Sequence, residues 1–440
     1  MEISDHVLAN MLKKKIARNK EDQKIMRSTL YCGSRVVKGK AGYEPGVFVL
    51  ANKESAMFWG TTTCKNAWIC PVCSARMMSK YAADIAAAID ALNEKNQAAF
   101  MITFTIPHSS GMSCEETTEI LFKTWSSFTV RGNHNLKSEN DKWKNADPFA
   151  SFCEEFNCTH RIRVGEYTWG KHGWHPHFHC LFFVDKNKFN KVADWQDKLN
   201  ERWMILAKRA TVKIWQKTFP DKTKKQIQQR ADIMFAKADK IGSKGAYISV
   251  DETGKVIVQK SSMYICGWGA DRELTGNYQQ KATNEGHMTP HEILQKAYNE
   301  KYLTSDEESE KWLNLYMEFA RAIKRKQHTR ISFGNSGLRQ IINKHKQTMG
   351  YREVIKKKFM EQAANVGTWK TVCWFNELQW LKICLLDRQY NVKFWILKLA
   401  KEYGRDAVKN YLSEFFNIHL IERPNFTQDV VEKIFGINAA

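Results

Sequence analysis

The chain has 440 residues, 43% of them hydrophobic, so we expect two or three domains with real cores and exclude wholesale disorder. Its 68 Lys and Arg against 47 Asp and Glu give a formal net charge of +21, which favours a polyanionic partner because each phosphate contact releases counterions. No apolar run approaches the ~20 residues of a membrane-spanning helix, and the N-terminus lacks a signal-peptide core. We therefore expect a cytoplasmic protein that binds nucleic acid and no membrane.

The first segment predicted to carry a site is a cysteine-rich knuckle that follows a basic arm and the short strands of residues 31–59. Eleven cysteines without an export signal favour reduced thiols and metal ligands over a disulfide framework. Cys64, Cys70 and Cys73 form a C-x5-C-x2-C pattern, with Cys32 as the candidate fourth ligand. Two thiolates three residues apart in a tight turn reach one ion, so the pattern predicts a closed, structural Zn²⁺ site. Unrelated buried cysteines are the alternative.

The rest of the chain alternates between strand and helix patterns and contains no internal repeat or low-complexity tract. From residue 290 onward it is mostly helical and rich in Trp and Lys. Residues 98–110 form a β-rich apolar run in which Pro107 ends the expected strand, and a helix over 115–130 and a polar loop over 131–150 follow. A hairpin is expected to turn near Gly170–Gly173, followed by basic helices over 187–240. A second hairpin turns at Glu252–Gly254, and a helix begins near residue 261.

The second strand of the first hairpin, "GWHPHFHCLFF", places three histidines at alternate positions. Alternate side chains of a strand share one face, so His175, His177 and His179 are predicted to point the same way. Glu166 lies on the preceding strand and can approach His177 or His179 across the hairpin. A carboxylate with two imidazoles suits Mg²⁺ or Mn²⁺ near phosphate, and Zn²⁺ is also compatible. The alternative is a polar strand face whose histidines are satisfied by hydrogen bonds.

Tyr264, early in the helix that follows the second hairpin, is the candidate nucleophile, since a phenol can attack phosphorus and form a phosphotyrosine. Its ordinary pKa of ~10 requires a metal, a cation or a base nearby. Lys260 precedes it by four residues and would share its face if the helix extends that far back. Taken alone, Tyr264 is better explained as a packing residue.

Together these motifs resemble a rolling-circle replication initiator, a Rep protein of the HUH endonuclease superfamily, of the plasmid and phage type with an N-terminal cysteine knuckle. The name HUH stands for His-hydrophobic-His. The resemblance covers roughly residues 32–342. It rests on "FMITFTIPH", "HPHFHCLFF" and "MYICGWGADRELTG" in that order, and on "CKNAWICPVC", "KATNEGHMTPHEIL" and "RISFGNSGLRQII".

The resemblance implies an α+β fold with an antiparallel-sheet endonuclease core. The domains would be residues 1–95 with the zinc knuckle, 96–300 with the endonuclease and 301–440 as a helical region for DNA binding or self-association, as in a homodimer. His177 and His179 would take the metal positions with Glu166, and His175 matches a flanking histidine. The family's Tyr-x-x-Lys motif has Gly267 at its fourth position here, so Lys260 or Arg272 would have to replace the missing lysine.

The implied reaction starts when the protein binds a double-strand origin and exposes a single-stranded nick site. Tyr264 would attack the DNA, leaving a 5′-phosphotyrosine and a free 3′-OH that primes a host DNA polymerase. Termination would need a second nucleophile, either a second tyrosine or water activated by a carboxylate. Glu273 is the candidate base for that water, and a helix cap or a solvated helix face is the alternative role for this residue. The rival nucleophiles are Tyr247 and Tyr278.

No phosphate-binding loop is present, so a host helicase would unwind the DNA. An HUH transposase and a non-catalytic, zinc-containing DNA-binding regulator are the competing functions. The transposase would act on element ends, and the regulator would bind DNA without cutting it.

Overall fold

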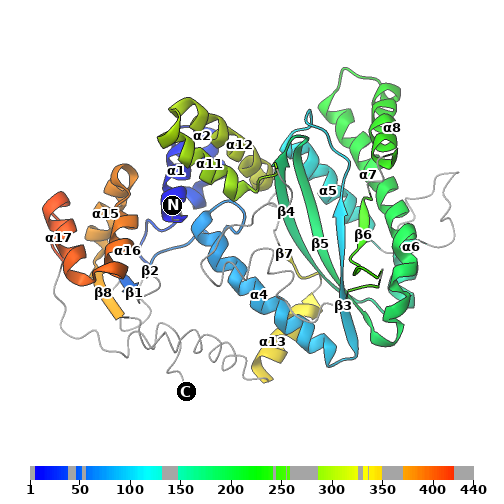
Figure 1. Ribbon diagram of the computed structural model, residues 1–440, viewed down its shortest axis with the longest axis horizontal. Helices are drawn as coiled ribbons and strands as arrows, with labels where there is room; N and C mark the ends of the chain where they lie inside the picture. Colours follow the sequence, from blue (N-terminus) through cyan, green and yellow to red (C-terminus); the bar gives the residue numbers. More distant parts are fainter. Residues whose placement is uncertain are drawn as a thin grey trace. The chain divides into compact units, whose positions relative to one another are not determined.

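The computed structural model describes residues 5–37, 46–51, 56–130, 147–240, 244–253, 255–257, 286–325, 331–334, 336–348 and 370–420. It is a mixed α+β chain with two antiparallel sheets and a helical C-terminal part (Figure 1). The chain divides into two compact units, Met1–Met77 with Lys344–Ala440 and Met78–Asn343, so both ends belong to the same unit. The division into three domains, with boundaries at residues 95 and 300, remains a prediction.

The larger unit is built on a five-stranded antiparallel sheet in the order β6-β3-β5-β4-β7. The predicted first hairpin is confirmed, because β4 and β5 pair along their whole lengths from His160↔Phe183 to Gly170↔Gly173. Gly173 has φ +86°, a conformation that an L side chain adopts only with strain. The strands are β3 (Gln97–Thr105), β4 (His160–Gly170), β5 (Gly173–Asp185), β6 (Ala246–Ile248) and β7 (Ile331–Ser332).

One face of this sheet carries the core of the larger unit. Phe100, Phe104, Phe178 and Phe182 are fully buried there and pack edge to face among other aromatic rings. Helices lie against this side of the sheet in Figure 1. They are α5 (Cys114–Phe128), α6 (Pro148–Glu155), α7 (Gln196–Thr218) and α8 (Lys224–Lys240), with the 3₁₀ segment η2 (Lys186–Trp195) leading into α7.

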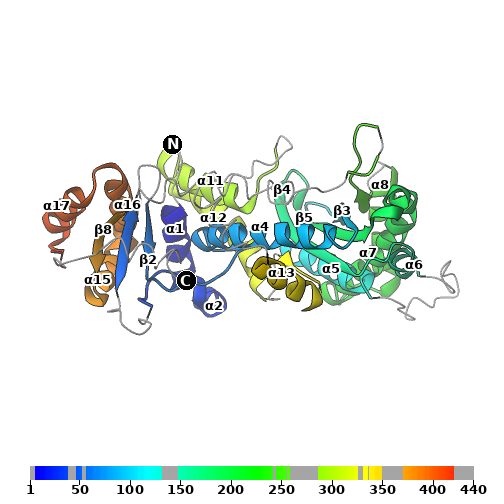
Figure 2. The same cartoon turned by 90° about the horizontal axis from the view of Figure 1, so that it is seen from below.

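Two further helices, α11 (Pro290–Leu303) and α12 (Asp306–Arg325), form an antiparallel pair in the same unit. Thr289 caps α11, accepting a hydrogen bond from the Glu292 backbone while the Glu292 side chain accepts one from Thr289 N–H. Phe319 of α12 packs against Tyr167 and Trp174, so the pair covers the hairpin end of the core face. Seen from below in Figure 2, α4 (Pro71–Asn93) and α13 (Ser336–Thr348) lie next to each other.

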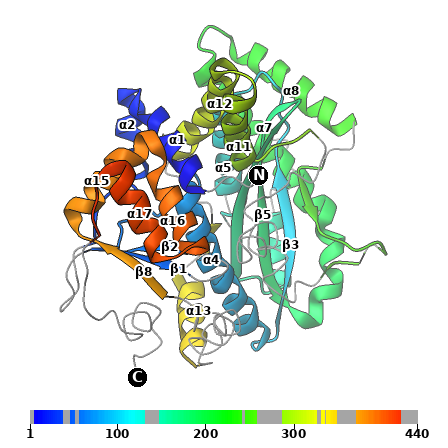
Figure 3. The same cartoon turned by 60° about the vertical axis from the view of Figure 1, so that its left-hand side comes forward.

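The smaller unit joins the N-terminal segment to the C-terminal one through a second sheet, in the order β2-β1-β8. Trp374 and Trp380 are buried in its core, so in the described part of the chain these two tryptophans pack the fold. Figure 3 shows α15, α16 and α17 beside these strands. The elements are α1 (Asp5–Ala17), α2 (Lys20–Ile25), α3 (Arg27–Leu30), β1 (Val47–Ala51), β2 (Ala56–Trp59), β8 (Lys370–Phe375), α15 (Glu377–Tyr390), α16 (Val392–Glu402) and α17 (Arg405–Phe416).

None of the helices in the described ranges is both long enough and apolar enough to cross a membrane.

Candidate functional site

The face of the five-stranded sheet opposite the core carries a compact group of one carboxylate and two imidazoles. Glu166 lies directly opposite His177 in the β4–β5 pairing, and His179 is two residues further along the same face. Glu166 Oε2 is 2.9 Å from His177 Nε2 and 3.1 Å from His179 Nε2. The three ligand atoms all lie within 4.8 Å of one another, which is close enough for one metal ion.

The neighbouring strand β3 orients this group. Thr103 is the cross-strand partner of His179, and its Oγ1 lies 2.9 Å from His179 Nδ1. That contact leaves Nε2 of the buried His179 directed at Glu166. A hydrogen bond to the far nitrogen of a ligating imidazole fixes its tautomer and ring plane, as metal sites in proteins commonly require.

The charges in this group match what a metal needs. Burial on its own would raise the pKa of Glu166, but the imidazoles of His177 and His179 hold that pKa well below its usual range. Burial lowers the pKa of His179 to about 4 against the opposing effect of Glu166. At neutral pH the group is therefore an ionised carboxylate with His179 neutral, and a carboxylate with neutral imidazole lone pairs suits divalent ions such as Mg²⁺, Mn²⁺ or Zn²⁺.

His175 occupies the same face but has other partners. Its Nε2 lies 2.8 Å from Thr105 Oγ1, and its ring packs 4.7 Å from the ring of His108. Burial, together with His177 and His108, lowers the pKa of His175 to about 2. His175 is not among the residues whose ligand atoms converge, whereas the other three predicted ligands are.

Sequence reasoning did not single out Thr103, Thr105, His108 or His287 as residues of this face. The two threonines and His108 stand at near-alternate positions in "TFTIPH", and that spacing was the available signal. His287 has no such local signal, because the isolated bridge between Trp169 and Met288 brings it to the hairpin. A Cβ atom at Gly170 would lie only 2.9 Å from His287 Cδ2, so glycine permits this approach.

Three residues proposed for the chemistry, Tyr264, Lys260 and Glu273, lie outside the described residues, as do Gly267 and Tyr278. The rival nucleophile Tyr247 is described. It lies on β6 opposite Thr103, which places it on the histidine face two strands from His179, about 10 Å away between Cα atoms. Its side chain is well exposed.

The four cysteines of the predicted knuckle converge in the smaller unit. Cys32 Sγ is 3.4 Å from Cys73 Sγ and 3.8 Å from Cys70 Sγ, and Cys64 Sγ is 3.5 Å from Cys73 Sγ. Zinc–sulfur bonds of ~2.3 Å in a tetrahedron require sulfurs about 3.8 Å apart, so the spacing fits one Zn²⁺. Cys32, the ligand least evident from spacing, belongs to the cluster, which could therefore bind zinc.

The fold and these sites define a mixed α+β protein with a two-histidine, one-carboxylate sheet face and a tetracysteine cluster. Among curated proteins, the chain is similar to one named "Protein rep" from Streptomyces lividans, with 26% identity over 138 residues. The similarity covers 28% of this chain and 30% of the relative's length. No family model matches the chain. No solved structure matches it either.

Proposed function

We propose that the protein is a rolling-circle replication initiator of the HUH type, which nicks and rejoins one DNA strand at a plasmid or phage origin. The observation that carries the proposal is the convergence of Glu166, His177 and His179 on adjacent strands, with Thr103 behind His179. The similarity to a protein named Rep, and the basic charge of the chain, support the same function.

In this proposal Glu166, His177 and His179 hold Mg²⁺ or Mn²⁺. A divalent ion bound there supplies Lewis-acid stabilisation of charge on the scissile phosphodiester. The phenolic oxygen of Tyr264 forms a bond to phosphorus while the bond to the 3′ oxygen breaks, and that oxygen leaves as a 3′-OH after taking a proton. Lys260 supports the developing charge, and Glu273 activates water when the covalent link is released.

The free 3′-OH then primes a host DNA polymerase, with a host helicase unwinding the duplex ahead of it. Tyr247, which lies on the histidine face, is the described alternative to Tyr264 as nucleophile. Because a host helicase unwinds the duplex, this mechanism needs no nucleotide-binding domain in this chain.

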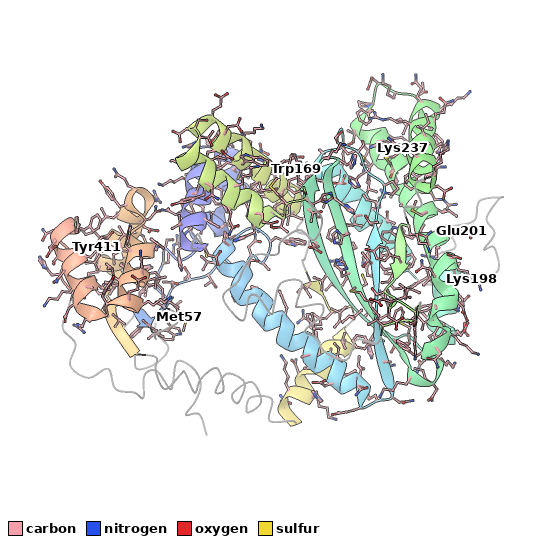
Figure 4. The ribbon with its side chains drawn as sticks, in the orientation of Figure 1. Met57, Trp169, Lys198, Glu201, Lys237 and Tyr411 are labelled. Atoms are coloured by element: carbon pink, nitrogen blue, oxygen red, sulfur yellow. The ribbon has the colours of Figure 1, made fainter. Side chains whose placement is uncertain are left out.

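The helical layer behind the sheet offers a surface for duplex DNA. Figure 4 shows Lys198 and Lys237 on α7 and α8. Lys213 and Lys217 are exposed on α7, close enough to Lys123 of α5 that, after burial, they are the main causes of its lowered pKa. Because this basic layer lies on the opposite side of the sheet from the histidines, we assign it to the origin duplex and the histidine face to the cleaved strand.

Removing two of these lysines should weaken DNA binding in a salt-dependent way. We expect the double variant Lys213→Gln, Lys217→Gln to lower the slope of log affinity against log salt by about 0.9 for each lost phosphate contact. Fluorescence anisotropy on duplex DNA from 50 to 200 mM salt, roughly, measures that slope. Lys222→Gln is the control, because that ammonium already lies 3.3 Å from Asp221. An unchanged slope in the double variant would remove α7 from the DNA-binding surface.

Substitutions that remove or keep the hydroxyl of Thr103 test whether this residue orients His179. When Nε2 of His179 holds a metal, Nδ1 carries the proton and donates to Thr103 Oγ1. We expect Thr103→Val to weaken Mn²⁺ binding roughly 10–100-fold, because it leaves a buried N–H unpaired. Thr103→Ser keeps the hydroxyl and should bind Mn²⁺ like the unchanged protein. Equal Mn²⁺ affinities of the two variants in titration calorimetry would show that this hydrogen bond has no part in metal binding.

A further inference from the structure

The backbone carbonyl of Gly33, the residue after Cys32, is a meeting point for side chains from the C-terminal helices. Trp380 Nε1 of α15 donates to this oxygen at 3.2 Å, and Lys393 Nζ of α16 donates to it at 3.1 Å. Cys384 Sγ of α15 lies 3.7 Å from the same oxygen. Residues more than 340 positions later in the chain thus contact the loop that carries one cysteine of the cluster.

The N-terminal helix α1 contacts the same region. Lys13 Nζ donates a hydrogen bond to the carbonyl of Cys32. Three residues earlier, Asn10 Nδ2 donates to the carbonyl of Asp387 and, at 2.8 Å, to Asn391 Oδ1. The cysteine loop therefore contacts α1 as well as α15 and α16, and these helices also contact one another through Asn10.

The charges around this loop favour metal-bound cysteines over neutral thiols. Lys13 and Lys393 bring two ammonium groups to the carbonyls of Cys32 and Gly33, and Lys393 is almost completely buried. The carboxylate that lies with them is Asp387, whose Oδ2 is 3.9 Å from Lys393 Nζ. Four neutral thiols would leave a net positive charge in this interior, which is unfavourable. Four thiolates around one Zn²⁺ carry two net negative charges, which the two ammonium groups stabilise.

We propose that Zn²⁺ bound by Cys32, Cys64, Cys70 and Cys73 fastens α15 and α16 to the N-terminal segment, so that the two ends of the chain dock only in the metal-loaded state. The zinc centre then holds distant segments of one chain together, in addition to stabilising the local cysteine loop. Because metal-binding free energy is also folding free energy for such a site, loss of the ion loosens both partners together. This inference does not depend on DNA cleavage.

The test is hydrogen exchange of the full-length protein before and after zinc removal by a chelator, with metal content measured by atomic emission. We expect amides of α1, α15 and α16 to exchange roughly tenfold faster or more without zinc, while amides of β3 and β5 are unaffected, and added Zn²⁺ to restore the protection. Unchanged exchange in α15 and α16 after confirmed zinc loss would overturn the proposal. So would the absence of tetrathiolate absorption bands when Co²⁺ is added to the metal-free protein.

A charge variant separates docking from metal binding. We expect Lys393→Met to retain one zinc per chain yet to speed exchange in α15 and α16, because it removes the contact with the Gly33 carbonyl and unbalances Asp387. Lys401→Met, exposed on the same helix, is the matched control and should behave like the unchanged protein. If the amides of α15 and α16 exchange at the same rate in Lys393→Met and Lys401→Met, the contact with the Gly33 carbonyl does not hold these helices in place. Because neither variant removes a ligand, this comparison stays informative even if the metal-free chain aggregates.

Discussion

The double variant His177→Ala, His179→Ala is expected to lose metal-dependent cleavage of single-stranded DNA by roughly 10³-fold or more. Both imidazole nitrogens that face Glu166 disappear, so the carboxylate alone cannot hold an ion, and Lewis-acid stabilisation contributes several kcal/mol to such reactions. Initial rates on a labelled strand with added Mn²⁺ give the measurement.

The control for this variant is His172→Ala. His172 is exposed in the turn between β4 and β5, outside the converging group. It should cleave at the rate of the unchanged protein, and all variants should bind the same duplex with equal affinity. Undiminished cleavage by the double histidine variant would remove the sheet face from the mechanism.

The second large effect concerns stability and follows from a buried ion pair. Arg202 is completely buried, where its guanidinium pairs with Asp147 and donates at 2.8 Å to the carbonyl of Phe128. Arg202→Met would leave the Asp147 carboxylate largely buried without its partner cation. We expect the free energy of unfolding to fall by about 3–5 kcal/mol, because an uncompensated buried charge costs that much.

Urea denaturation of the full-length protein, followed by circular dichroism, measures this loss. The variant Arg202→Met, Asp147→Asn removes both charges and should recover part of the stability, since a neutral pair leaves no uncompensated ion. Lys213→Met, exposed on the same helix, is the control and should change the free energy of unfolding by no more than ~0.5 kcal/mol. If Arg202→Met matched Lys213→Met, the ion pair would not contribute to stability.

The parts of the site that are encoded locally could be predicted from the sequence. The alternation of His175, His177 and His179 defines one face of a strand, and a turn a few residues away brings Glu166 opposite His177. The second hairpin is also local, and Val250 and Val256 bridge as its pattern predicts. The convergence of Cys64, Cys70 and Cys73 follows likewise from their spacing.

The parts set by distant contacts could not be predicted in this way. The pairing of β1 with β8 joins Val47 to Phe375, and no periodicity in either segment specifies such a partner. The sequence alone left core packing, a dimer contact and a separate DNA-recognition domain open for the Trp-rich segment. In the structure Trp374 and Trp380 are buried in the smaller unit. His175 shows the same limit, because its neighbours are Thr105, the last residue of β3, and His108, which lie some 70 residues earlier in the chain.

A covalent protein–DNA adduct is the direct signature of a tyrosine nickase. A labelled pool of single-stranded oligonucleotides, tiled from the DNA that flanks the gene, is incubated with protein and Mn²⁺ or Mg²⁺ and resolved on a denaturing gel. We expect a protein–DNA adduct at one sequence, which is lost in Tyr264→Phe and in the absence of metal. An adduct that persists in Tyr264→Phe would move the nucleophile to Tyr247 or Tyr278. No adduct from protein that demonstrably binds the same DNA would contradict the nickase and favour a non-catalytic DNA-binding regulator.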